Sequence, residues 1–274
     1  MRTKKILLII NTITPYQLDF FDELKRRVKL NVIFHNKNYK NYNFNYKEKN
    51  YQFFLEQKKN PVKFIKILIN KFQPDLILIG GYRLKYNSKI IDFLKKKNIK
   101  FFYWLENLNS KNYLKYNFVK YLIGKKIKAS NGVLAVGNNA KTIYSEYTKN
   151  VINFPYSIKV PKIEKKKFFH EKKINFLFVG QLIERKGLGY IFSAFNKLSK
   201  KEKEKLNLNI VGEGNLRGKL KQFLKINTYT KYHGFLFGKN LSKIYKKSDV
   251  LLFPSKFDGW GVVPMEAMSN SLSL

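Results

Sequence analysis

Residues 249–268 read DVLLFPSKFDGWGVVPMEAM, and this stretch decides the fold that the sequence predicts. An apolar strand, Val250–Phe253, runs into a turn at Pro254-Ser255. A loop with two glycines follows, and we expect a helix to begin near Pro264, because proline suits the first turn of a helix. A strand, loop and helix in this order direct free backbone N–H groups and the positive end of the helix dipole toward the end of the strand. The pattern therefore favours a phosphate or diphosphate site.

Two carboxylates bracket this predicted site, Asp258 and Glu266, with seven residues between them. Gly259 and Gly261 would let a ligand approach the backbone closely, because glycine has no side chain. Strand–loop–helix segments with two glycines are nevertheless common, so a plain turn stays open as an alternative.

The same residues resemble the signature of retaining glycosyltransferase family four, the glycosyl transferases of group 1, in which an acid and a glutamate flank seven residues. The resemblance covers residues 174–268 and is looser over residues 1–157. Three upstream segments also carry it, namely Phe176–Leu182, Arg185–Gly187 and Val211–Gly214. Members of this family have the GT-B fold, an α/β fold in which two Rossmann-like domains face each other across a cleft. The resemblance therefore implies this fold and the transfer of a sugar from a nucleoside-diphosphate sugar without a metal ion.

Arg185 and Lys186 are predicted to bind the diphosphate of the donor. Arginine occurs at only six positions in the chain, which otherwise uses lysine for positive charge. A planar guanidinium binds phosphate oxygens in pairs, whereas lysine acts as a point charge. The resemblance assigns the same role to this pair, and an exposed basic turn is the alternative. The predicted diphosphate site is completed by the loop residues Gly259, Trp260, Gly261 and Val262.

The resemblance gives Glu266 hydrogen bonds to the ribose of the nucleotide and Asp258 a contact with the donor sugar, so both are catalytic candidates. Asp258 stands where the family usually has glutamate, and its side chain is one methylene shorter. The alternatives are a turn residue for Asp258 and a helix-start carboxylate for Glu266. Further nucleoside-binding candidates end two other predicted strands, namely Gly180, His233, Gly234 and Phe235. Local packing is the alternative for His233.

Residues 1–157 alternate short apolar runs with helical patterns, which indicates βα units and a parallel sheet that is covered on both faces. The predicted strands are Lys5–Ile10, Leu30–Phe34, Asp75–Ile79, Lys100–Trp104 and Gly132–Val136. The predicted helices are Tyr16–Arg27, Pro61–Phe72, Ser88–Lys97, Lys111–Lys128 and Asn138–Tyr147. Residues 36–50, rich in Asn, Lys and Tyr, are expected to form a loop.

A linker is predicted over residues 158–172, where prolines and a lysine run interrupt the pattern. A second doubly wound domain, residues 173–274, follows and is expected to bind the nucleotide-sugar. Its predicted strands before residue 250 are Ile174–Val179, Asn207–Val211 and Thr230–His233, and its predicted helices are Gly187–Leu198, Leu216–Leu224 and Leu241–Lys247. The resemblance also leads us to expect that this domain is incomplete, because Ser271 and Ser273 stand where the family has a Gly-x-Pro-Val turn.

The first domain, residues 1–157, is expected to bind the acceptor. Open α/β sheets bind ligands at the carboxyl ends of their strands, and Thr14 and Tyr16 follow the first predicted strand. Glu106 follows the strand Lys100–Trp104 in the same way, and it is our candidate for an acceptor-side polar group or a catalytic base. A structural ion pair with a nearby lysine is the alternative for Glu106.

The composition narrows the classes of partner. The net charge is +37, and three readings of it are lysine-rich solvated faces, attraction to an anionic membrane surface, and nucleic-acid binding. The lysines are spread along the chain without a nucleic-acid-binding motif, so we expect no nucleic-acid partner. The sequence has no cysteine and no Asp-x-Asp, so we expect no metal and no cofactor, and the nucleotide-sugar would be a substrate. The apolar run after Lys5 is too short for a signal peptide.

The sequence thus predicts a metal-independent retaining glycosyltransferase that uses a UDP- or GDP-sugar. The acceptor would be a cell-surface glycan such as lipopolysaccharide, or a lipid-linked glycan. We expect a cytoplasmic protein that is peripheral to the inner face of the cell membrane. The alternative is an inactive truncated fragment, or a basic protein that binds membranes or anions through charge alone.

Overall fold

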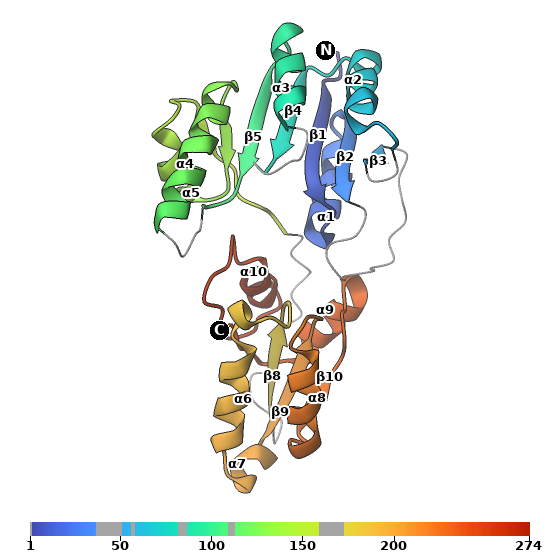
Figure 1. Ribbon diagram of the computed structural model, residues 1–274. Helices are drawn as coiled ribbons and strands as arrows, with labels where there is room; N and C mark the ends of the chain where they lie inside the picture. Colours follow the sequence, from blue (N-terminus) through green and yellow to red (C-terminus); the bar gives the residue numbers. More distant parts are fainter. Residues whose placement is uncertain (1, 37–50, 56–57, 82–86, 109–112, 159–172) are drawn as a thin grey trace. The chain divides into compact units, whose positions relative to one another are not determined.

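The computed structural model describes residues 2–36, 51–55, 58–81, 87–108, 113–158 and 173–274 (Figure 1). These residues divide into two compact units, with the division after Ser157. Each unit contains a parallel β-sheet covered by helices, which is the α/β class that the sequence predicts.

The first unit has a seven-stranded sheet in the order β3-β2-β1-β4-β5-β6-β7. Its strands are β1 (Lys5–Thr12), β2 (Lys29–Asn36), β3 (Gln52–Phe54), β4 (Leu76–Gly80), β5 (Phe101–Leu105), β6 (Val133–Ala135) and β7 (Val151–Asn153). Its helices are α1 (Pro15–Lys25), α2 (Pro61–Phe72), α3 (Asn87–Lys96), α4 (Tyr113–Lys128) and α5 (Asn138–Ser145). All neighbouring strands in this sheet run parallel.

The inner strand β1 shows why this sheet forms. Leu7, Leu8 and Ile9 have no exposed surface, and Ile10 is 3% exposed, so both faces of the strand are covered. An apolar run without alternation is typical of a parallel strand between two layers of helices. The predicted strand Lys5–Ile10 is therefore confirmed, and it continues to Thr12.

The second unit has a four-stranded parallel sheet in the order β10-β9-β8-β11. Its strands are β8 (Ile174–Val179), β9 (Leu206–Val211), β10 (Thr230–Tyr232) and β11 (Val250–Leu251). Its helices are η1 (Glu184–Lys186), α6 (Leu188–Lys197), α7 (Lys200–Glu204), α8 (Arg217–Ile226), α9 (Gly238–Lys247) and α10 (Val262–Ser269). In both sheets the chain order reverses beside the first strand of the unit, at β1–β4 and at β8–β11. Ligands of open α/β sheets bind at such switch points.

Several predicted bounds differ from the structure. Helix α10 begins at Val262, two residues before the predicted start at Pro264. Proline is tolerated at the third helical position because the first N–H groups of a helix have no intrahelical acceptor. Strand β11 ends at Leu251 rather than Phe253, although the Leu252 N–H still donates to the Leu177 carbonyl at 2.7 Å.

The sequence analysis missed four short elements: β3, β7, η1 and α7. Beyond α10, Ser271 has a φ of 61° and Ser273 bridges Val250 in parallel, which buries Leu272 between them. The predicted linker, residues 158–172, and the predicted loop, residues 36–50, lie outside the described residues. Ile158 and Asn36 are the exceptions. That the second domain is incomplete, and that the two domains face a cleft, stay predictions.

Candidate functional site

The predicted diphosphate residues gather at the switch point of the second sheet. Helix η1, which contains Arg185 and Lys186, follows β8, and the loop 254–261 follows β11. Strands β8 and β11 are neighbours, with Val250 paired to Phe176 and Leu251 to Leu177. Because both strands run in the same direction, their carboxyl ends meet at one edge of the sheet.

A glycine fixes η1 against this loop. Gly187 has a φ of 77°, and a Cβ there would lie 2.1 Å from the carbonyl oxygen of Pro254. The Lys256 N–H donates to the Arg185 carbonyl at 2.9 Å. The backbone of η1, from which Arg185 and Lys186 extend, is therefore held against the loop that contains Asp258. Only glycine fits at position 187, where the two segments touch.

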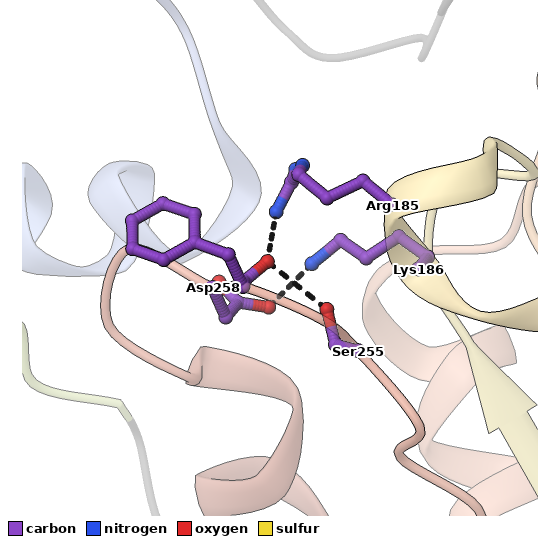
Figure 2. A network of polar contacts seen from close by, with 5 residues as sticks. Arg185, Lys186, Ser255 and Asp258 are labelled. Carbon is purple, nitrogen blue, oxygen red and sulfur yellow. Dashed lines mark hydrogen bonds and ion pairs between the residues drawn. The ribbon is translucent and has the colours of Figure 1, made fainter. Parts of the chain in front are cut away.

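Figure 2 shows Arg185 and Lys186 extending from η1 toward the loop that contains Asp258. The Arg185 guanidinium donates a short hydrogen bond to the Phe257 carbonyl, which also accepts from the Ser255 hydroxyl at 3.0 Å. The Lys186 ammonium forms a short ion pair with Asp258, and the two side chains are only 12% and 25% exposed. The sequence analysis gave Lys186 and Asp258 separate partners, whereas the structure joins them to each other.

The loop leads directly into α10. Gly261 is the N-cap of α10 with a φ of 80°, and the Met265 N–H donates to the Gly261 carbonyl at 3.3 Å. The N–H groups of Val262 and Val263 precede that bond in the first turn, where helical N–H groups have no intrahelical acceptor. Together with the dipole of the helix they favour an anion at this end.

Glu266 is oriented by a residue that the sequence analysis did not identify. The Tyr245 hydroxyl, on α9, donates to Oε2 of Glu266 at 2.9 Å, and Tyr245 is 2% exposed. Burial, and then the charge of Glu266, raise the pKa of Tyr245 well above its ordinary value. The hydroxyl therefore stays protonated and acts as a fixed donor to the carboxylate. No motif spacing links residues 245 and 266, so only the fold reveals the pair.

Of the predicted nucleoside-binding residues, Gly180 follows β8, and His233, Gly234 and Phe235 follow β10, with β9 between these two strands. The Gly180 N–H donates to the Val211 carbonyl at 3.0 Å, and the Gly212 N–H donates to the Gly234 carbonyl at 2.8 Å. A Cβ at Gly212 would lie 1.8 Å from the Gly180 carbonyl oxygen, so the turns after β8 and β9 are in direct backbone contact. Gly180 and Gly234 thus lie in one layer at this edge of the sheet.

Two further polar groups lie in this layer. His233 Nε2 is 2.8 Å from Oδ1 of Asn209, and burial together with Lys231 lowers the pKa of His233. Glu213 accepts a hydrogen bond from the Tyr232 hydroxyl at 2.6 Å, and its Oε2 lies 3.6 Å from the Arg217 guanidinium. Because its pKa is lowered, His233 is neutral near pH 7. Phe235, the other predicted nucleoside-binding residue in this segment, stacks with Phe237 at 6.2 Å between ring centroids.

The acceptor-side candidates lie in the first unit. Thr14 is the N-cap of α1, without a side-chain capping bond, and its hydroxyl is buried without a hydrogen-bond partner. The Tyr156 hydroxyl donates to Oε1 of Glu106 at 2.9 Å, and the Tyr156 ring centroid lies 5.1 Å from those of Tyr16 and Trp104. Tyr16 and Glu106 therefore border one aromatic cluster at the carboxyl ends of β1 and β5, and Thr14 lies two residues before Tyr16.

Tyr156 bears on the proposed chemistry of Glu106. Burial raises the pKa of Tyr156 far above its ordinary value, so its hydroxyl remains a donor to Glu106. A carboxylate has two oxygens with about four lone-pair sites, so the hydrogen bond from Tyr156 to Oε1 orients Glu106 and is compatible with either predicted role, an acceptor-side polar group or a base.

Within the described residues, no three His, Cys, Asp or Glu side chains gather as a metal site would require. None of the helices in those ranges is long and apolar enough to cross a bilayer. The absence of a metal and of a cofactor stays a prediction.

Comparison with known proteins shows which family and which fold this chain resembles. Residues 159–273 match the model of the family described as Glycosyl transferases group 1. The α/β fold of the chain, with its parallel sheets, matches those of solved GT-B glycosyltransferases over 98% of its length. The chain aligns with only 29–34% of the length of the first three curated relatives that it matches.

Particular relatives follow from the same comparison. An uncharacterised glycosyltransferase of Methanocaldococcus jannaschii is 35% identical over 115 residues, which are 36% of this chain and only 29% of that protein. The solved structure of Anabaena Alr3699/HepE in complex with UDP has a TM-score of 0.71 and 13% identity, and the alignment covers 98% of this chain and 79% of that one. The apo form of the lipopolysaccharide outer core galactosyltransferase WaaB has a TM-score of 0.64 and 16% identity, with the same two coverages.

Proposed function

We propose that this protein is a metal-independent retaining glycosyltransferase of family four that binds a nucleoside-diphosphate sugar in its second unit. One observation carries the proposal: Arg185 and Lys186 converge with the loop leading into α10 at the switch point of the second sheet. Two fixed cations and a helix N-terminus form a site for a diphosphate. The UDP bound to HepE supports UDP as the first nucleotide to test, with GDP as the second.

The proposed reaction is the exchange of one C–O bond for another. The bond between the anomeric carbon and the phosphate oxygen breaks, and the nucleoside diphosphate leaves with the electron pair. The acceptor hydroxyl attacks the same face of the sugar, and its proton passes to the departing phosphate oxygen. Arg185, Lys186 and the start of α10 would stabilise the charge that develops on that oxygen, and Glu266 would hold the ribose. Removal of one fixed donor of this kind typically slows catalysis by about 10²–10³-fold.

The first unit is proposed to bind the acceptor. The name of WaaB, a lipopolysaccharide galactosyltransferase, supports a cell-surface glycan or a lipid-linked glycan as the acceptor class. The aromatic cluster around Tyr16, Trp104 and Tyr156 would supply faces for sugar rings. Glu106, oriented by the Tyr156 hydroxyl, would serve on the acceptor side as a polar contact or as a base. The protein would work in the cytoplasm at the inner face of the cell membrane.

The proposal is tested by titrating the full chain with UDP, GDP and UMP by calorimetry at low and moderate salt. We expect saturable binding of one nucleoside diphosphate that is tighter than binding of UMP, because the second phosphate contacts Arg185 and Lys186. Equal affinity for all three nucleotides would contradict the proposal.

A second candidate is favoured by the net charge of +37, namely a protein that binds anions through charge alone. Such a protein would lose affinity steeply with salt and would not distinguish between nucleotides. The same titration therefore separates the two candidates.

A further inference from the structure

The first unit contains a small cavity beside its aromatic cluster. The lining comes from α1, from β5 and from the segment after β7, namely Tyr16, Gln17, Phe20, Trp104 and residues 154–157. Pro155 and Ser157 are exposed, so one side of the cavity lies at the surface. The volume of the cavity is about 10 Å³, which is close to the minimum that one water-sized group requires.

Two side chains of this lining carry buried polar atoms. Gln17 is 8% exposed and Trp104 is 5% exposed. Within the ranges that the structure describes, neither Oε1 of Gln17 nor Nε1 of Trp104 has a hydrogen-bond partner. A buried polar group without a partner is unfavourable, and native proteins keep few of them. Two such atoms on the lining of one cavity therefore point to a ligand that completes both hydrogen bonds.

The two atoms restrict the chemistry of this ligand. The amide oxygen of Gln17 accepts a hydrogen bond, whereas the indole N–H of Trp104 only donates one. A hydroxyl group satisfies both, because it has one O–H donor and two acceptor lone pairs. An ionised carboxylate has no proton for the amide oxygen, and an ammonium group has no lone pair for the indole N–H. The pair therefore selects a hydroxyl group.

The size and the lining of the cavity favour the hydroxymethyl group of a hexose. A hydroxyl attached directly to a sugar ring cannot enter so small a space without the ring, whereas a CH₂OH group projects one carbon farther. The rings of Tyr16, Phe20 and Trp104 supply apolar surface for its methylene. Tyr156, also on the lining, donates to Glu106 at 2.9 Å, so a sugar ring beside Tyr156 lies near the acceptor-side carboxylate.

We propose that this cavity is a subsite for the primary hydroxyl of a hexose in the acceptor, with Gln17 and Trp104 as the residues that determine its specificity. The hydroxyl donates to Oε1 of Gln17 and accepts from the Nε1–H of Trp104. It replaces solvent water without the loss of a hydrogen bond, whereas the methyl group of a 6-deoxy sugar cannot. That this sugar belongs to the acceptor rests on the proposed function; that the first unit binds a hydroxymethyl group does not.

The experiment follows the indole N–H signals of the full chain, labelled with ¹⁵N-tryptophan, by NMR. The chain has two tryptophans, and Trp260→Phe assigns their signals. At least one of methyl α-glucoside and methyl α-galactoside should move the Trp104 signal downfield in a saturable manner, because the N–H gains an acceptor. The 6-deoxy analogue of that sugar should bind at least about tenfold more weakly, since it leaves both polar atoms unpaired.

Two results of this titration would overturn the proposal. In the first, a parent sugar and its 6-deoxy analogue shift the Trp104 signal with equal affinity. In the second, neither parent sugar shifts it. Either result would assign the cavity to water only.

Gln17→Leu removes the acceptor and keeps a side chain of similar volume. This variant should lose the preference for the parent sugar over its 6-deoxy analogue, whereas Gln222→Leu, at an exposed position of α8, should keep it. Urea unfolding tests a purely structural role. Gln17→Leu should unfold at the same or a higher urea concentration than the wild type, because it buries no unpaired amide. A retained preference, or unfolding at lower urea, would assign the amide to the fold and overturn the proposal.

Titration of the same samples with UDP measures the proposed function separately. A protein that binds UDP and does not distinguish the two sugars keeps the proposed function and loses this subsite. A protein that selects the hydroxymethyl group without preferring a nucleoside diphosphate keeps the subsite, and the transferase assignment fails.

Discussion

Lys186 and Asp258 hold each other in the free protein, and this pairing has a consequence for donor binding. The Lys186 side chain is only 12% exposed, so its ammonium interacts with the Asp258 carboxylate more than with water. A diphosphate that enters the site must share Lys186 with Asp258, or displace it. Asp258 would then set donor affinity as well as contact the sugar.

Replacing Asp258 with Asn removes a negative charge next to the diphosphate site and frees Lys186. We expect UDP to bind roughly three- to tenfold more tightly, while sugar transfer slows. Calorimetry measures the first effect and product formation the second. Asp19→Asn, which removes an exposed charge from the first unit, is the control. Weaker UDP binding by the Asp258 variant would mean that the carboxylate holds Lys186 in its binding position.

Tyr245→Phe deletes the hydroxyl that donates to Glu266 and keeps the buried ring. A hydrogen bond to a charged group contributes about 1.5–3 kcal/mol, and part of it is recovered from water, so UDP affinity should fall about five- to tenfold. The loss should be smaller for 2′-deoxy-UDP, which lacks one of the proposed ribose contacts. Tyr121→Phe, at a 57% exposed residue of the first unit, should change neither affinity. An unchanged UDP affinity in Tyr245→Phe would remove Glu266 from the ribose site.

His233 gives a prediction for stability. Its folded-state pKa is lowered by burial and by Lys231, below the unfolded value of about 6.5. The unfolded state therefore binds the proton more readily. The contribution of His233 to the free energy of unfolding is present above pH ~6.5 and is lost as the pH falls below that value. Urea unfolding at several pH values should show that His233→Gln weakens this dependence. If the free energy of unfolding depends on pH in the same way in the wild type and in His233→Gln, the prediction is wrong.

Two glycines at the start of α6 test how η1 is held. Gly187→Ala places a Cβ against the Pro254 carbonyl in a left-handed conformation, and it should lower the free energy of unfolding by more than about 2 kcal/mol. Gly189→Ala, two residues later, meets no atom within 4 Å and should raise it by about 0.5–1 kcal/mol. Thermal or urea denaturation measures both. If the two changes have the same sign, the contact between η1 and the loop does not exist in solution.

How well each element was predicted depends on how much of it is buried. The continuous apolar run of β1 and the strand before Gly180 were found because they lie at the centre of their sheets. The three-residue strands β3 and β7 were missed, since edge strands form through their neighbours rather than through an apolar run of their own. Short η1 and α7 carry no periodicity that a sequence pattern could reveal.

The same reasoning applies to the site. The resemblance to family motifs identified Arg185, Lys186, Asp258 and Glu266, because each motif is a short stretch of sequence. Arg185 and Lys186 are consecutive, and seven residues separate Asp258 from Glu266. The partners Tyr245 and Tyr156 lie 21 and 50 residues from Glu266 and Glu106, so no local pattern could pair them. The ion pair between Lys186 and Asp258 spans 72 residues and was also invisible before the fold was known.

For the molecule as a whole, a charge of +37 means that any anion is attracted to the surface. Binding of UDP is therefore informative only if it depends on particular cations. Arg185 lies in the site and makes a short bond to the Phe257 carbonyl, whereas Arg26 is 76% exposed beside Glu23 in the first unit. Replacing either residue with alanine changes the total charge equally.

The most direct measurement is thus the UDP affinity of Arg185→Ala and of Arg26→Ala, compared with the wild type by calorimetry at moderate salt. We predict that Arg185→Ala weakens UDP binding at least about tenfold, since a charge-assisted pair to phosphate is lost, and that Arg26→Ala leaves it within about twofold. Equal affinities in the two variants would contradict the claim that cations fixed by the second unit hold the diphosphate.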